Sequence, residues 1–171
     1  MKNELWKFLI RLAIFTVVFG LIWFFWAQDA YPRFLKPIVF PFFQWIGVKK
    51  WRLSLLLDHF TNIVPYLALV CATPGFFAHW KKTIIALLGG MVILMIGHIA
   101  LSWLDYHYWS QYDMTKKFFR SIFHFYLLND ALPLGLWLLF YPKILPQLFS
   151  FLRFGKGGQT AETGISTAPP D

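Results

Sequence analysis

The stretch TIIALLGGMVILMIGHIALSWL, residues 83–104, has no charged side chain and is long enough to cross a bilayer. A helix of about 17–25 mostly apolar residues spans the hydrocarbon core. Three other stretches share this character: LAIFTVVFGLIWFFWAQ at 12–28, FTNIVPYLALVCATPGFFAHW at 60–80 and SIFHFYLLNDALPLGLWLLFYP at 121–142. The sequence therefore predicts an all-α, polytopic membrane helix bundle with about four transmembrane helices, over about residues 8–27, 60–79, 83–104 and 118–141.

The composition agrees with a membrane protein, since 58% of the residues are hydrophobic and only 14% are charged. A soluble domain carries roughly 25% charged residues, and so small a chain could not bury this much apolar surface in its own core. We predict one integral membrane helical domain, residues 1–154. The polar tail at 155–171 is rich in Gly, Thr and Pro, which predicts disorder.

The net charge of +8 comes from small basic clusters at the ends of the apolar stretches. This placement is typical of anchors to phospholipid headgroups, so we expect the lipid bilayer, and not nucleic acid, as a partner. The Lys and Arg residues divide equally between the two sides of a four-span topology. Because the first helix usually dominates orientation, its flanking Lys2, Lys7 and Arg11 predict that both termini are cytoplasmic.

The connection at 28–58 contains FLKPIVFPFFQWIGV, which is apolar but too short to cross. Proline removes a helical hydrogen bond, so we expect Pro37 and Pro41 to break this segment into a re-entrant or interfacial piece. A short amphipathic helix is expected around 50–59. Two other segments are predicted outside the membrane: a polar aromatic loop over 105–117 and a surface-lying helix over 143–154.

Backbone-shaping residues mark the second and third spans. Pro65 and Pro74 lie inside the second predicted span and are expected to kink it. The third span carries Gly89, Gly90 and Gly97, small residues that allow helices to approach closely.

Asp130 is the ionisable residue nearest the middle of a span, and Asn129 precedes it. A carboxyl group there costs a few kcal/mol, so it should face protein or water. Three interpretations remain open. Asp130 could lock helices together through a partner such as His98, it could take part in chemistry or transport, or LLNDALPLG could be a break between two shorter helices.

Asp58, His59 and Asn62 form a second polar group, at the start of the second span. Such side chains commonly cap the beginning of a helix. The alternative is a binding contact at the membrane surface. The second and fourth spans thus hold most of the intramembrane polar groups, and a working surface is expected between them.

Catalytic candidates are few. Cys71 lies mid-span, where cysteine usually behaves as a small hydrophobe, and a nucleophile would need a base such as His98 or His124. Arg120 and His124 are four residues apart and share one helix face, which excludes Asp130. The histidines lack the spacing of zinc ligands, so we expect no metal and no cofactor. We favour a non-enzyme over an enzyme.

The segment HFTNIVPYLALVCATPGFFAHWKKTIIALLGG resembles the membrane proteins encoded beside exosortase H. The similarity lies in a "PYxLALxxATP" type span, and a later Leu-rich run leads to Pro133 and Trp137. The residues that match in the first segment are Pro65, Tyr66, Leu67, Ala68, Leu69, Ala72, Thr73 and Pro74. The resemblance covers about residues 5–142.

The resemblance implies an exosortase-associated accessory protein in a bacterial inner membrane, next to a system that processes proteins with a C-terminal hydrophobic anchor. Exosortases themselves use Cys, Arg and His from different spans. Here Cys71 is followed by Ala72 and Thr73, and Arg120 shares a helix with His124, which disfavours a peptidase.

Three functions follow in order. The first is a non-catalytic accessory or scaffold that contacts another integral membrane protein. The second is a membrane cysteine peptidase that uses Cys71. The third is a small transporter or lipid-handling protein that uses Asp130 and Asn129, which would require an oligomer.

Overall fold

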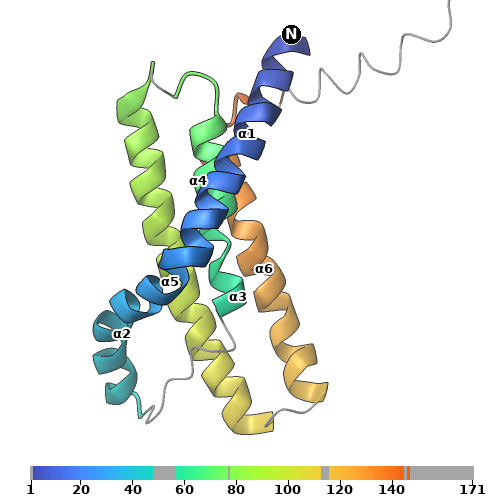
Figure 1. The fold of residues 1–171 in the computed structure, drawn as a ribbon. Coiled ribbons are helices and arrows are strands. Elements are labelled where there is room, and N and C mark those ends of the chain that lie inside the picture. The colour runs from blue at the N-terminus through green and yellow to red at the C-terminus, as the bar shows by residue number, and fades with distance from the viewer. Residues whose placement is uncertain (1, 48–56, 77, 113–115, 145, 147–171) are drawn as a thin grey trace, which may run out of the picture.

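The computed structural model describes residues 2–47, 57–76, 78–112, 116–144 and 146, and within them every regular element is a helix. In chain order these are α1 (Lys2–Ile22), the π-helical turn η1 (Trp23–Ala27), α2 (Gln28–Trp45), α3 (Leu57–Phe60), α4 (Ile63–Ala72), α5 (Trp80–Tyr112) and α6 (Lys116–Phe140). Figure 1 shows α1, α4, α5 and α6 bundled along a common direction, with α2 turned aside at one end. The predicted all-α membrane bundle is confirmed.

Three helical segments are long and apolar enough to span a membrane: Glu4–Trp45, Trp80–Trp109 and Lys117–Phe140. The second predicted span is shorter than expected, because α4 has only 10 residues. Such a helix is about 15 Å long, half of the ~30 Å hydrocarbon core. The chain therefore has three full-length apolar helices and one half-length helix among the described residues.

The prolines of the second span explain the length of α4. Pro74 disfavours the helical conformation at the residue before it, and Thr73 is accordingly extended, with φ −58° and ψ 129°. Gly75 then adopts a φ of +83°, which glycine accepts without strain. Pro65 lies in the first turn of α4, where no helical partner is lost. The prolines thus start and end α4, and the expected kinks within a long span are wrong.

The segment after the first span is a helix, so the predicted break at Pro37 and Pro41 is wrong. Both prolines are on the exposed side of α2, whereas Leu35, Val39 and Phe43 are buried at four-residue intervals. That buried stripe packs against a set of side chains that includes Met95, Ile99 and Tyr106 of α5. Packing of an amphipathic face outweighs the lost hydrogen bonds.

The aromatic cluster expected to end the first span is instead a π-helical turn. The backbone N–H of Gln28 bonds the carbonyl of Trp23, one residue further than in an α-helix. Trp23 is buried, while Phe24, Phe25 and Trp26 are at least 70% exposed. A π-bulge changes the direction of a helix, and Figure 1 shows α2 diverging from α1 at this point.

The last two helices differ in how well their ends were predicted. α5 continues to Tyr112 through the expected loop, since no Gly or Pro interrupts residues 98–112. α6 agrees with the predicted span at 118–141 and continues through Asp130 and Pro133, so LLNDALPLG is not a break.

The glycines of α5 make the close contacts that were predicted. A Cβ added at Gly90 would overlap the ring of Tyr66 from α4, and one at Gly97 would lie 3.1 Å from Leu132 Cδ1 of α6. Most of the helix predicted around 50–59, most of that over 143–154, and the tail lie outside the described residues.

Candidate functional site

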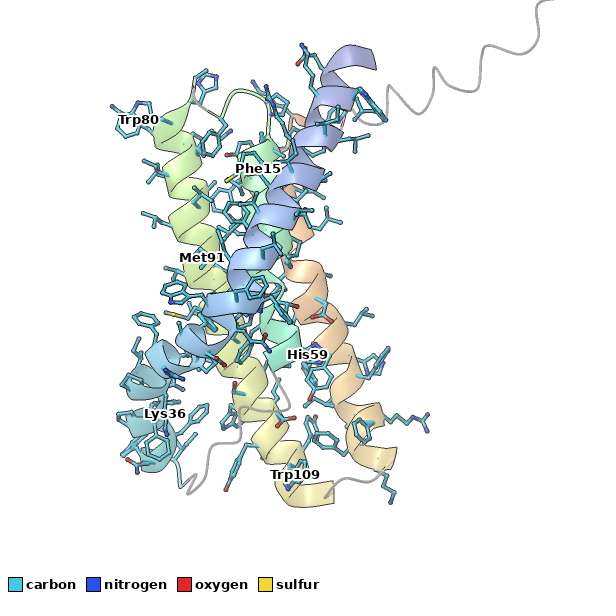
Figure 2. The ribbon with its side chains drawn as sticks, viewed as in Figure 1. Phe15, Lys36, His59, Trp80, Met91 and Trp109 are labelled. Atoms are coloured by element: carbon cyan, nitrogen blue, oxygen red, sulfur yellow. The ribbon has the colours of Figure 1, made fainter. Side chains whose placement is uncertain are left out.

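Polar side chains from α2, α4, α5 and α6 meet near the middle of the bundle. His98 of α5 is fully buried, and Asn62, which precedes α4, and Asn129 of α6 are about 95% buried. Tyr31 reaches them from the first turn of α2 because the π-helical turn directs α2 across α5. Figure 2 shows His59 of α3 beside α6, next to this group. The fold thus joins polar residues from segments far apart in the sequence.

A directed chain of hydrogen bonds joins four of these residues. The Nε2 of His98 lies 2.8 Å from Oδ1 of Asn62, and since an amide oxygen only accepts, Nε2 carries the proton. In the neutral ring Nδ1 is then an acceptor, and the hydroxyl of Tyr31 donates to it over 2.8 Å. The amide nitrogen of Asn62 donates to the backbone carbonyl of Asn129, also over 2.8 Å. The chain therefore ties α2, α4, α5 and α6 together without a formal charge.

Asn129 repairs the interruption between α3 and α4. The two helices are separated by a turn at Thr61 and Asn62, and Nδ2 of Asn129 donates to the carbonyl of His59 over 3.0 Å. Broken backbone at membrane depth is tolerated where neighbouring side chains satisfy its polar groups. Asn129 and Asn62 thus bond each other's segments reciprocally.

Asp130 and His59 form the outer edge of this network. Asp130 Oδ1 lies 3.3 Å from His59 Nδ1, and the two side chains are 50% and 24% exposed. The His59 ring stacks on Tyr126 with ring centroids 4.0 Å apart. Tyr126 in turn donates to Oδ1 of Asp105 over 2.8 Å, which joins α6 to α5. Asp105 is only 4% exposed, and the sequence had suggested it as the end of a span.

A second set of contacts lies at the other end of α4. The indole N–H of Trp137 donates to Oγ1 of Thr73 over 2.8 Å, and Thr73 donates to the carbonyl of Leu69 over 2.8 Å. Phe8 of α1 stacks on Trp137 with ring centroids 5.8 Å apart. Tyr66 donates to the backbone carbonyl of Ala86 in α5. Tyr66, Thr73 and Trp137, which belong to the motif of the family resemblance, are therefore contacts between helices.

Two interpretations of the polar residues are corrected by these contacts. His98 is not the partner of Asp130, because its two ring nitrogens are bonded to Tyr31 and Asn62. Asn62 precedes α4 but makes no side-chain capping bond, since its amide is used between helices. Asp58 lies in α3, and its side chain is outside the described set.

The catalytic candidates stay outside the network. Cys71 is half-buried near the end of α4, and no described histidine is hydrogen-bonded to it. Arg120 and His124 are both exposed on α6, and the ring of His124 lies against Phe123, 6.1 Å between centroids. Among the described residues, no three His, Cys, Asp or Glu side chains are placed to hold a metal ion.

The geometry indicates what each part of the site can do. The inner chain of neutral donors and acceptors holds helices in register, because each polar group that left it would be unsatisfied in lipid. Asp130 differs, since one carboxylate oxygen contacts His59 and no contact is recorded for the other among the described residues. Asp130 is thus the part of the site that can bind something outside the chain.

Tyr31, Tyr126 and Asp105 were missed by sequence reasoning. Tyr31 and Tyr126 are only two among many aromatic residues in the chain, and Asp105 lies at a charge boundary. Their shared signal is a polar group inside an apolar helix, which becomes informative only when helix ends are known. No family model, curated protein or solved structure matches this chain.

Proposed function

We propose that the chain is a non-catalytic accessory or scaffold protein that contacts another integral membrane protein through its helices. The observation that carries the proposal is the hydrogen-bonded chain from Tyr31 through His98 and Asn62 to Asn129. These intramembrane polar groups, the usual place for chemistry in a membrane protein, are bonded to one another. The bundle they hold is suited to presenting a fixed surface.

The proposal extends to an exosortase-type sorting system in a bacterial inner membrane. Its support is the resemblance of the Tyr66-to-Pro74 segment and of the late proline and tryptophan. Thr73 and Trp137 of this motif bond each other over 2.8 Å, which is a packing role and not a reactive one. In this proposal the protein crosses the membrane several times, with both termini in the cytoplasm.

Co-purification in a mild detergent from the native membrane tests the proposal. A tagged full-length chain is expected to recover a membrane protein in a stable ratio, and deletion of the chain is expected to reduce processing of anchored substrates. Recovery of the chain alone, even after crosslinking in the intact membrane, would refute the scaffold proposal.

A cysteine peptidase is the weaker alternative, because Cys71 has no histidine bonded to it among the described residues. The substitution Cys71→Ala decides between them. Processing in cells that carry only Cys71→Ala is expected to equal that of wild-type cells, with deletion of the chain as the reference for lost function. Processing that falls to the deletion level while the protein remains folded would favour the peptidase.

Transport or lipid handling has one observation in its favour, the half-exposed carboxyl group of Asp130 beside His59. A polar path through so small a bundle would need an oligomer. Flux that persists in Asp130→Asn, measured in vesicles against wild type, would remove its main residue.

A further inference from the structure

We infer that the α6 face around Asp130 is the docking surface for a transmembrane helix of a different membrane protein, one that carries a Lys or Arg near the middle of its span. This deepens the proposed scaffold function and rests on it. Four side chains define the face: Phe123, Leu127, Asp130 and Leu134. Their spacing of four, three and four residues places them on one side of the helix.

All four side chains are open to the surroundings. Phe123, Leu127 and Leu134 are 60%, 59% and 52% exposed, and the Asp130 side chain is 50% exposed. Apolar neighbours alone would be covered adequately by lipid. A carboxyl group among them is different, because facing lipid near mid-span costs a few kcal/mol.

His59 answers only part of that cost. Its contact with Asp130 is long, at 3.3 Å, and reaches one carboxylate oxygen. The ring of His59 is also fixed by its stack on Tyr126, so it cannot turn freely to improve the bond. The face therefore offers an acceptor, with a negative charge when ionised, flanked by apolar side chains. A helix with a cation at the matching depth complements it.

A second copy of the chain does not fit this face. Closed dimers pair identical patches, and two copies oriented alike in a membrane would place two Asp130 carboxylates opposite each other at one depth. Like charges that close disfavour the pair. The partner is thus expected to be a different chain.

Site-specific photocrosslinking in native membranes tests the inference on the full chain. A photoreactive residue at Leu127 or Leu134 is expected to crosslink to one membrane protein. The same probe at Leu88, which is 64% exposed on α5, is the position control. The crosslinked helix of the partner is expected to contain a Lys or Arg.

Charge variants provide the second arm. Asp130→Asn is expected to reduce the recovered complex about tenfold, as loss of a charge pair in low dielectric does. Asp29→Asn, an exposed carboxylate on α2, is the matched control and should leave recovery unchanged. Asp130→Lys should abolish the complex, and exchanging the partner's basic residue for Asp should restore it. Equal circular dichroism and elution of the variants show that they fold.

The outcomes separate the inference from the scaffold function. A crosslink to a second copy, to residues 48–56 of the same chain, or to lipid alone would overturn the inference. Recovery of a partner that is indifferent to Asp130 would also overturn it but leave the scaffold function standing. Failure to recover any partner by any variant would overturn both.

Discussion

Replacing Asn62 with leucine tests whether the polar network holds the helices together. The change keeps a similar side-chain volume but removes the bonds to His98 Nε2 and to the Asn129 carbonyl, each 2.8 Å long. A side-chain hydrogen bond between membrane helices contributes about 0.6–1.7 kcal/mol. The Nε2 proton of His98 would also stay buried without an acceptor. We expect the free energy of unfolding to fall by about 2–4 kcal/mol.

Reversible unfolding in mixed micelles, followed by far-UV circular dichroism as the fraction of dodecyl sulfate rises, measures this change. Ser102→Ala is the matched control, because Ser102 is buried but donates over 2.7 Å to the His98 carbonyl of its own helix. It should cost less than about 1 kcal/mol. A double-mutant cycle of Asn62→Leu with His98→Leu should give a coupling of at least about 0.5 kcal/mol. An Asn62→Leu effect no larger than that of Ser102→Ala would refute the network's structural role.

Two further changes probe the contacts around α4, and both are measured by the same unfolding titration. Gly90→Ala should destabilise by about 1–3 kcal/mol, because its Cβ would overlap the Tyr66 ring. Gly20→Ala has no atom within 4 Å of its new Cβ and should be neutral or slightly stabilising, so equal effects of the two alanines would contradict the packing described. Trp137→Phe should cost about 0.6–1.7 kcal/mol by removing the bond to Thr73, and a cycle with Thr73→Val that shows no coupling would speak against this bond.

Hydrophobic stretches and their lengths were sufficient to predict the helices that cross the bundle. α6 begins and ends within two residues of the prediction, because its charged flanks coincide with its ends. The glycines of α5 were also read correctly, since a missing side chain has one simple consequence in a helix pair. These features depend on local sequence alone.

The failures came from features that depend on neighbouring helices. The prolines of α2 looked like breaks, yet Leu35, Val39 and Phe43 bury enough surface against α5 to keep the helix. The pairing of Asp130 with His59 depends on the turn at Thr61, which sets how far α3 reaches along α6. The sequence could name the polar residues of the site, but only the packed helices show which of them bond.

The half-length α4 has a consequence for how the protein enters the membrane during synthesis. A helix of 10 residues is too short to partition into the bilayer as an independent span. It packs against α1, which is translated before it, and against α5 and α6, which follow. Stable insertion of α4 must therefore wait until the later helices emerge from the ribosome. Its short length makes this protein's biogenesis cooperative, with the central helix the last to settle.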